Sequence, residues 1–369
     1  MPEDFIGLMS GTSLDGVDGV LADFSAASPK VAAHASRAFP ASLRAELLAL
    51  NSSGADELQR AALAGNALVR VYSHVVHELL ASAGIPASSV AAIGAHGQTV
   101  RHRPQEFDGT GYTLQLNQPA LLAELTGIDV VADFRSRDLA AGGQGAPLAP
   151  FFHQALFAQA GQAIGVLNIG GISNITLLRA DGSMLGFDCG PGNALIDGWI
   201  QRHQGKDFDS EGTWAAGGKL VPALLQRIRA EPYFGRMPPK STGRDLFNGP
   251  WLAKQLLGFE SAAAQDVQAT LTELTAAACA GEVLRHEPKL ARLIVCGGGA
   301  LNTHLMQRLR ALLPVVDVIS SAEAGLPPLQ VEATAFAWLA RKTVRREKLE
   351  LQSTTGARGA RVLGCVYPA

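Results

Sequence analysis

The chain has 369 residues, of which 47% are hydrophobic and 17% are charged, and its formal net charge is −2 at pH 7. A chain of this length exceeds one typical core, so two domains are expected. The charge balance, without a long lysine and arginine block, disfavours nucleic acid and membrane surfaces as partners. No signal pattern or membrane-length apolar run is present, which predicts a cytoplasmic location. Four scattered cysteines without a CxxC pair predict free thiols rather than disulfides or a zinc site.

The first predicted elements form a strand–turn–strand hairpin, FIGLMSGTSLDGVDGVLADF, at residues 5–24. Its turn is rich in glycine and hydroxyl groups, which offer backbone N–H groups in a concave arrangement that suits a phosphate. The turn lacks the lysine of a P-loop, and a strand follows where a P-loop would begin a helix. Any phosphate would therefore sit on the turn itself. An ordinary surface hairpin is the alternative interpretation when this turn is taken alone.

The next predicted elements alternate between strands and helices. A third strand at 31–39 precedes a long helix at 56–83, which is indicated by the spacing of its apolar residues. A strand at 90–94, the polar stretch HGQTV, the strand TLQL, the helix PALLAELTG and the strand IDVVADF follow. This order predicts a mixed sheet covered by helices. The segment at 135–150 is rich in glycine, alanine and proline, and we interpret it as an interdomain crossing or a cleft wall.

The opening pattern recurs at 164–181, where IGVLNIGGISNITLLRAD aligns without a gap with IGLMSGTSLDGVDGVLAD. Identities are few, but a third strand follows both copies, here SMLGFDCG at 183–190. Later, ARLIVCGGGALN at 291–302 predicts a buried strand that ends in three glycines before a helix. Glycines at a strand end let the backbone lie flat against a ligand. Two phosphate-type turns and this strand end together favour a duplicated nucleotide-binding protein.

These features resemble the superfamily of actin, the sugar kinases and the heat-shock chaperone ATPases. More closely, GLMSGTSLDGVDG, HGQTV, NIGGISN, FDCGPGNALID and the ending STTGARGARVLGCVYPA resemble the anhydro-N-acetylmuramic acid kinases of bacterial cell-wall recycling, from Ile6 to Pro368. The resemblance implies an α/β fold of two RNase H-like domains of the actin/hexokinase type, with mixed β-sheets and an active site in the interdomain cleft. We predict an N-terminal domain at 1–135, with a C-terminal tail at about 345–369 packing back on it, and a C-terminal nucleotide-binding domain at 136–344.

The resemblance implies that ATP, water and 1,6-anhydro-N-acetylmuramic acid give N-acetylmuramic acid 6-phosphate and ADP. The 6-oxygen of this substrate lies in an internal ether and carries no proton. A base must therefore activate water at the anomeric carbon while the departing oxygen takes the phosphoryl group. Asp188, which ends a strand before the turn CGPGN, is interpreted as this base, and capping of the next helix is its alternative role. Cys189 departs from the family pattern, which is expected to have threonine there.

The remaining site residues follow from the same resemblance. Asp15 or Asp18 would hold the waters around Mg²⁺, although turn formation alone also explains either aspartate. Arg135 is expected to bind the lactyl carboxylate of the sugar, with Arg137 as its competitor, and Glu332 has the alternative role of stabilising a helix N-terminus. The residues predicted to bind ATP are Gly11, Thr12, Ser13, Leu14, Asp15, Gly16, Val17, Asp18, Asn168, Gly170, Gly171, Ser173, Asn174, Gly297, Gly298 and Gly299. Those predicted to bind the sugar are Gln98, Thr99, Arg135, Gly190, Asn193 and Glu332. Asp15 is the residue predicted to hold magnesium.

Two other functions are compatible with the sequence. An ordinary sugar kinase of the same superfamily would use Asp188 to deprotonate a free hydroxyl, and a non-enzymatic ATP-gated binding module would hydrolyse ATP slowly without any sugar. The second is disfavoured because 369 residues leave no room for a separate peptide-binding domain. His96 and His102 lack a third metal ligand and are interpreted as hydrogen-bonded residues at strand ends. The sequence leaves the oligomeric state open, a homodimer included.

Overall fold

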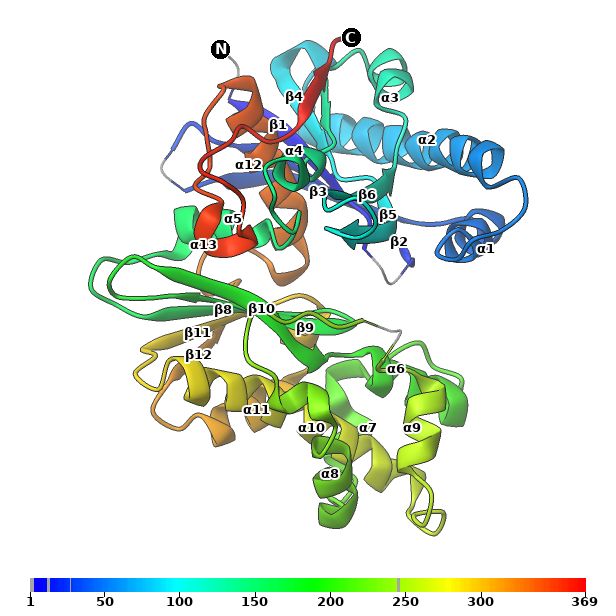
Figure 1. Ribbon diagram of the computed structural model, residues 1–369, viewed down its shortest axis with the longest axis vertical. Coiled ribbons are helices and arrows are strands. Elements are labelled where there is room, and N and C mark those ends of the chain that lie inside the picture. The colour runs from blue at the N-terminus through cyan, green and yellow to red at the C-terminus, as the bar shows by residue number, and fades with distance from the viewer. Residues whose placement is uncertain (1–2, 12–13, 27, 244–245) are drawn as a thin grey trace. The chain divides into compact units, whose positions relative to one another are not determined.

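The computed structural model describes residues 3–11, 14–26, 28–243 and 246–369 (Figure 1). Its contacts divide the chain into unit 1, which consists of Met1–Phe152 and Gln330–Ala369, and unit 2, which consists of His153–Leu329.

The predicted domain boundaries differ from these units in two places. The sequence predicts residues 136–152 and 330–344 in the second domain, whereas both ranges belong to unit 1. The physical reason is packing: α4 (Ser136–Ala140) contacts β6 (Gly111–Leu116), and α12 (Val331–Val344) contacts the central strands of the first sheet.

Unit 1 is built on a six-stranded mixed sheet in the order β13-β7-β4-β1-β2-β3 (Figure 1). The first three strands form an antiparallel meander, β4 runs parallel to β1, β7 runs parallel to β4, and β13 pairs antiparallel with β7. The C-terminal end of the chain thus completes the first sheet. The strands are β1 (Asp4–Met9), β2 (Gly16–Asp23), β3 (Lys30–Ala38), β4 (Val90–Ala95), β7 (Val130–Ala132) and β13 (Cys365–Tyr367).

Helix α12 lies unusually close to one face of this sheet. A Cβ atom at Gly7 would lie 1.8 Å from the carbonyl oxygen of Ala333, and one at Gly94 would lie 2.1 Å from that of Phe336. Gly7 and Gly94 are direct partners on β1 and β4. Glycine at both positions therefore lets the backbone of the helix approach the strands.

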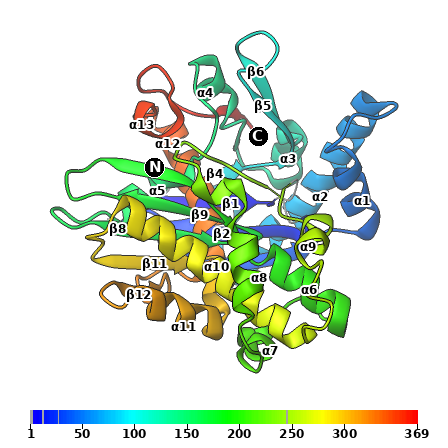
Figure 2. The same cartoon turned by 60° about the horizontal axis from the view of Figure 1, so that its bottom comes forward.

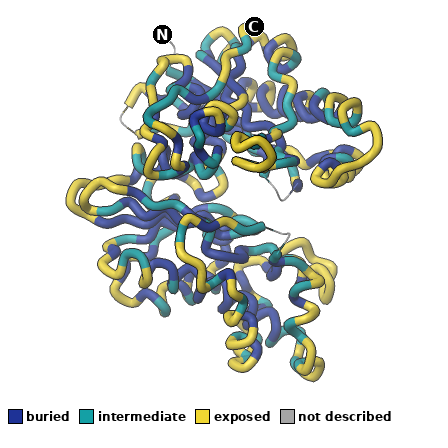
Figure 3. Tube along the Cα trace, viewed as in Figure 1, coloured by how far each residue is buried: buried dark blue, intermediate teal, exposed yellow. Residues whose placement is uncertain are grey.

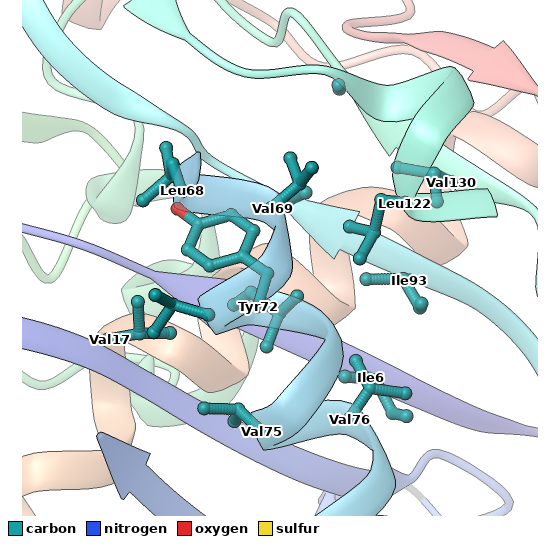
Figure 4. Close-up of a cluster of buried hydrophobic side chains, with 14 of the residues drawn as sticks. Ile6, Val17, Leu68, Val69, Tyr72, Val75, Val76, Ile93, Leu122 and Val130 are labelled. Carbon is teal, nitrogen blue, oxygen red and sulfur yellow. The ribbon is translucent and has the colours of Figure 1, made fainter. Parts of the chain in front are cut away.

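The other face of the sheet packs against α2 (Glu57–Ala83), as the alternation of side chains along a strand requires. Figure 4 shows Ile6 and Val17 from the strands beside Tyr72, Val75 and Val76 of this helix. All five side chains are at most 1% exposed. Full burial of each aliphatic side chain stabilises the fold by about 1.5–3 kcal/mol.

Unit 2 repeats this arrangement with a five-stranded sheet in the order β10-β9-β8-β11-β12. Its first three strands again form an antiparallel meander, and two parallel strands follow on the other side of the first strand. This order matches β3-β2-β1-β4-β7 of unit 1 and confirms the predicted α/β class, with an RNase H-like sheet in each unit. The strands are β8 (Ile164–Ile169), β9 (Ile172–Leu178), β10 (Met184–Pro191), β11 (Arg292–Cys296) and β12 (Asp317–Ser320).

Helices α10 (Ala264–His286) and α11 (Thr303–Leu312) pack on this second sheet, as Figure 2 shows. Figure 3 shows the strands of both units mostly in the buried colour, with exposed residues in loops and on outer helix faces. In the described ranges, no helix has the length and apolar character that a bilayer crossing requires. The other elements are α1 (Ala41–Ala49), β5 (Gln98–Pro104), α3 (Pro119–Thr126), α5 (Ala149–Phe157), α6 (Ala194–Gln204), α7 (Thr213–Ala216), α8 (Pro222–Arg229), α9 (Gly249–Gln255) and α13 (Gln352–Thr355).

Candidate active site

Asp188 lies near the end of β10, where the strand register breaks. Asp188 pairs with Asn174 and Gly190 pairs with Ser173, so Cys189 is an extra residue in the strand and forms a β-bulge. Gly190 has a φ of +144°, a conformation that L side chains rarely adopt. Bulges of this kind recur beside active sites, where they change the direction of a neighbouring side chain.

Hydrogen bonds fix both the backbone and the carboxylate of Asp188. Its N–H donates to the carbonyl of Lys240 at 3.2 Å, and its own carbonyl accepts from the Tyr233 hydroxyl at 2.7 Å. The backbone N–H of Thr242 donates to Oδ2 of the carboxylate at 3.0 Å. The N-cap of α6 is Asn193, not Asp188, so the structure does not support the alternative role of Asp188 as a helix cap.

The surroundings of Asp188 shift its protonation equilibrium. Burial raises the pKa of Asp188 to about 6, while the Thr242 N–H group and the Lys240 ammonium partly oppose this rise. The carboxylate is thus mostly ionised at neutral pH and a stronger base than an exposed aspartate. A group with this pKa is well matched to general-base catalysis near neutral pH.

Asp188 belongs to a row of polar residues that crosses the second sheet. Asp188 on β10 is paired with Asn174 on β9, which is paired in turn with Asn168 on β8. Side chains of directly paired residues project from the same face of a sheet. A carboxylate and two carboxamides are therefore aligned across three strands.

The glycine-rich segments of unit 2 meet at one end of this row. Gly192 and Asn193 donate backbone hydrogen bonds to the carbonyls of Gly171 and Gly170, at 2.9 and 2.8 Å. A Cβ atom at Gly297 would lie 2.3 Å from Oδ1 of Asn168. The structure thus brings together the predicted residues Asn168, Gly170, Gly171, Asn193, Gly297, Gly298 and Gly299.

Ser173 lies beneath these turns rather than at their surface. It is fully buried, and a Cβ atom at Gly192 would lie 3.0 Å from its hydroxyl oxygen. Gly299 has a packing role of its own, because a Cβ atom there would lie 2.3 Å from Cγ2 of Ile169. Asn174 is half-buried in the polar row described above.

The predicted phosphate turn of unit 1 lies between β1 and β2, and its Thr12 and Ser13 fall outside the described residues. The carbonyl of Gly11 accepts from the Leu14 N–H at 3.3 Å and from Nε2 of Gln98 at 3.1 Å. Gln98 is fully buried, so its side chain supports the turn. The half-buried Thr99 accepts a hydrogen bond from Gln115 at 3.3 Å.

The other predicted residues of this turn have different surroundings. The side chains of Leu14 and Val17 are buried in the core, so only their backbones are available to a nucleotide. Asp15 is exposed, whereas Asp18 is half-buried and lies 3.8 Å from Nε2 of His34. A Cβ atom at Gly16 would lie 2.4 Å from a carbonyl oxygen of β3, so strand pairing alone requires this glycine.

Arg135 is held in a defined position at the start of α4. Its guanidinium lies 2.9 Å from Nε2 of His96 and donates to the carbonyl of Gly145 at 2.8 Å. Burial, and then the nearby Arg135 charge, lower the pKa of His96 to about 3, so its neutral ring accepts this hydrogen bond. Burial also lowers the pKa of Arg135 to about 10, although Glu332 and Asp138 oppose this. Arg135 stays charged at neutral pH.

Glu332 is exposed in the first turn of α12. Its negative charge lies close enough to Arg135 to raise the pKa of that guanidinium. Arg137, the predicted competitor of Arg135, is exposed on α4.

His102 is hydrogen-bonded to the hydroxyl of Thr113 at 3.0 Å. In the part of the chain that the structure describes, no group of three or more His, Cys, Asp and Glu side chains is arranged to hold a metal ion.

Sequence reasoning misses Asp138, which organises the surroundings of Arg135. Asp138 is fully buried and accepts hydrogen bonds of 2.6 Å from the Gly145 N–H and from the Thr355 hydroxyl. It therefore connects the segment after Arg135 to the C-terminal motif STTGARG. The sequence signal that could have indicated Asp138 is the presence of a charged residue inside an alanine- and glycine-rich segment. Sequence reasoning also misses Tyr233, Lys240 and Thr242, which surround Asp188.

The family model described as anhydro-N-acetylmuramic acid kinase matches residues 3–369. A protein of that name from Variovorax paradoxus (strain S110) is 66% identical, and the match covers 100% of this chain and 99% of the relative. Another protein of that name, from Cupriavidus metallidurans (strain CH34), is 58% identical, and the match covers 99% of this chain and 98% of the relative.

Solved structures show only distant similarity. The activator of 2-hydroxyisocaproyl-CoA dehydratase from Clostridium difficile, with bound ADPNP, has a TM-score of 0.48 and 12% identity, with 93% of this chain and 96% of that chain covered. A ROK family glucokinase from Streptomyces griseus, in complex with glucose and AMPPNP, has a TM-score of 0.43 and 14% identity, with 92% and 99% covered. The family model and the full-length relatives, in contrast, show that this chain belongs to the anhydro-N-acetylmuramic acid kinase family.

Proposed function

We propose that this chain is an ATP-dependent kinase that opens 1,6-anhydro-N-acetylmuramic acid with water and phosphorylates its 6-oxygen, in cytoplasmic recycling of peptidoglycan. Family membership supports the reaction class. The observation that carries the proposal is Asp188, a half-buried carboxylate with a pKa of about 6 at a bulged strand end, beside the glycine-rich turns of unit 2.

In the proposed reaction, Asp188 takes a proton from water, and the water oxygen forms a bond to the anomeric carbon. The bond between that carbon and the 6-oxygen breaks, and the 6-oxygen attacks the γ-phosphorus of ATP, so that ADP leaves. The proton remains on Asp188 until product release. Because the 6-oxygen has no proton of its own, one base suffices for the whole sequence.

We propose that the glycine-rich turns of unit 2 bind the nucleotide. The absence of side chains at Gly170, Gly171 and Gly298 lets a ligand approach their backbone closely. The N–H of Gly297 donates to the carbonyl of Pro328 at 3.0 Å, so Gly297 would contribute close approach and not a hydrogen-bond donor. When bound, Mg²⁺ would neutralise charge on the phosphates. Magnesium is usually held by one or two carboxylates and several waters, and the exposed carboxylate of Asp15 would take this role.

We propose that Arg135 recognises the lactyl carboxylate of the sugar. Its guanidinium is oriented by the neutral His96 ring and by the Gly145 carbonyl, and it is partly removed from water. A planar, desolvated guanidinium forms strong charge-assisted hydrogen bonds with a carboxylate. Arg135 belongs to unit 1 and Asp188 to unit 2, so the proposed reaction requires both units. The interdomain cleft stays a prediction.

Product analysis by mass spectrometry tests this function. With ATP, the anhydro sugar and ¹⁸O-labelled water, we expect N-acetylmuramic acid 6-phosphate that carries the label on its anomeric hydroxyl and none on its phosphate. The mass spectrum must be recorded before the anomeric oxygen exchanges with solvent. Phosphorylation of the opened sugar alone would favour an ordinary sugar kinase. ATP turnover that is slow and independent of any sugar would favour a binding module.

A further inference from the structure

A buried ion pair lies behind Asp188 in unit 2. Nζ of Lys240 lies 2.9 Å from Oε1 of Glu282, and the two side chains are only 2% and 5% exposed. Glu282 belongs to α10, whereas Lys240 lies in the loop between α8 and α9. The ammonium also lies 5.0 Å from the ring centre of Tyr233 and 5.7 Å from that of Phe187.

This pair is connected to Asp188 through the backbone of residues 240–242. The carbonyl of Lys240 accepts the Asp188 N–H, and the Thr242 N–H donates to the Asp188 carboxylate. The side chain of Lys240 is thus anchored to α10, while the backbone on either side of Ser241 is hydrogen-bonded to Asp188. A shift of this loop would move the hydrogen-bond donor and the positive charge away from the carboxylate together.

We propose that Lys240 and Glu282 are a positioning pair for Asp188, which holds residues 240–242 against β10 and keeps one positive charge beside the carboxylate. This inference deepens the proposed function, since it concerns the group that would activate water. Replacing a buried ion pair by apolar residues of similar size is often neutral or stabilising. Stabilisation of the fold therefore explains the presence of this buried ion pair poorly, and positioning of Asp188 explains it better.

The other ionisable groups around the pair do not supply the same charge. His286 on α10 lies 3.2 Å from Glu282, but burial lowers its pKa, so its ring is mostly neutral at neutral pH. Arg285 lies 3.8 Å from Glu282 and is 42% exposed, so solvent screens its charge.

The neutral groups near Asp188 do not supply a charge either. Burial raises the pKa of the thiol of Cys189, which therefore stays neutral, and its partner thiol is Cys279. Burial likewise raises the pKa of Tyr233, whose phenol stays protonated. Lys240 is the cation that lowers the pKa of Asp188.

The double variant Lys240→Met/Glu282→Leu tests this inference, because it leaves no unpaired charge in the interior. Carbon-13 NMR of the full chain labelled at the aspartate carboxyl carbons follows the titration of Asp188, and Asp188→Asn identifies its signal. We expect the titration midpoint of Asp188 to move upward by ~1 pH unit in the double variant. The acid limb of kcat/KM should move with it, which lowers kcat/KM by ~5-fold at pH 6 and leaves it almost unchanged at pH 9.

A matched control is available on the same helix. Glu273 of α10 forms an ion pair with Arg308 of α11, with 2.6 Å between Oε2 and Nε. The variant Glu273→Leu/Arg308→Met should leave the Asp188 midpoint unchanged, and Lys240→Arg, which keeps the cation, should retain it. An unchanged midpoint in the Lys240→Met/Glu282→Leu variant, or an equal shift in the control variant, would overturn the inference. Since the NMR titration needs no turnover, failure of the wild-type chain to convert the sugar would count against the proposed function alone.

Discussion

The hydroxyl of Tyr233 donates a hydrogen bond of 2.7 Å to the backbone carbonyl of Asp188. Tyr233 is 1% exposed and packs edge-on against Phe247, so its hydroxyl is held in place by the core of unit 2. The carbonyl that it fixes directly precedes the bulged residue Cys189. A buried aromatic side chain thus fixes the backbone at the point where the strand changes register. This contact keeps the proposed base in one orientation.

The first prediction concerns catalysis by Asp188. The variant Asp188→Asn should lower kcat by about 10²–10⁴, because the amide cannot accept a proton from water. Nucleotide affinity, measured by calorimetry, should stay within a few-fold of the wild type. Asp181→Asn is the matched control, since Asp181 is an exposed turn residue before the same strand. Turnover near the wild-type level in Asp188→Asn would exclude Asp188 as the base.

The second prediction concerns stability and pH. Folding raises the pKa of Asp188 from 3.8 to about 6. The unfolded chain therefore loses its proton more readily, and the free energy of unfolding falls as the pH rises from about 4 to about 6. Asp188→Asn removes this loss of stability and should increase the free energy of unfolding by on the order of 3 kcal/mol at pH 8. Below about pH 3 the two chains should be equally stable, because Asp188 is then protonated in both states. Urea unfolding at both pH values measures the difference, and an equal difference at the two would contradict the assignment.

The third prediction separates recognition of the sugar from binding of ATP. Arg135→Met should raise KM for the anhydro sugar by about 10–100-fold, the equivalent of losing one charge-assisted hydrogen bond, and leave KM for ATP unchanged. Arg135→Lys should recover only part of this loss, because an ammonium cannot form the planar paired contact. The exposed Arg137→Met is the control and should behave like the wild type. A similar increase of KM in both methionine variants would remove Arg135 from the sugar site.

The fourth prediction tests the nucleotide turns of unit 2. Gly297 has a φ of +76°, and a Cβ atom there would lie 2.3 Å from Oδ1 of Asn168. Gly297→Ala should therefore displace the turn, at a cost of about 1–3 kcal/mol, and weaken ATP binding by ~10-fold. Gly281→Ala, in the C-terminal part of α10 with open space around it, should retain affinity and stabilise the fold by up to about 1 kcal/mol. Unchanged affinity in Gly297→Ala would place the nucleotide elsewhere.

Local patterns in the sequence predict much of the fold. The apolar spacing that predicts a helix at 56–83 agrees with α2 at Glu57–Ala83, and the repeated strand–turn–strand pattern corresponds to the antiparallel meanders of both sheets. These features depend on periodicity and turn residues, which are visible along the chain. The domain boundaries depend instead on long-range packing. The close approach of α12 to Gly7 and Gly94 has no local signal, so the sequence pattern alone predicts residues 330–344 in the wrong unit.

The candidate site shows the same division. Motifs in the sequence indicate Asp188 and the glycine-rich turns, because special backbone conformations and strand ends leave a compositional signal. The groups that adjust Asp188 lie more than forty positions away along the chain, at Tyr233, Lys240 and Thr242. Burial of Gln98 and Ser173 likewise follows from tertiary packing, so a polar residue in a motif is not by itself a ligand contact.

The last prediction is stereochemical and follows from a single base. The 1,6-anhydro bridge fixes the anomeric carbon in the β configuration, so water activated by Asp188 must approach opposite the departing 6-oxygen. Direct displacement inverts this centre, and the first N-acetylmuramic acid 6-phosphate formed should be the α anomer.

Retention would require a carboxylate nucleophile and a covalent intermediate, with a second carboxylate about 5–5.5 Å away. Glu282 is the carboxylate that lies behind Asp188, but its side chain is 5% exposed and paired with Lys240, so it is not accessible to a sugar. Proton NMR of the fresh product, recorded before mutarotation mixes the anomers, distinguishes the two outcomes. A β anomer that appears first would exclude direct displacement by Asp188-activated water, yet it would leave phosphorylation of the 6-oxygen intact, because the stereochemistry at the anomeric carbon does not depend on which oxygen receives the phosphoryl group.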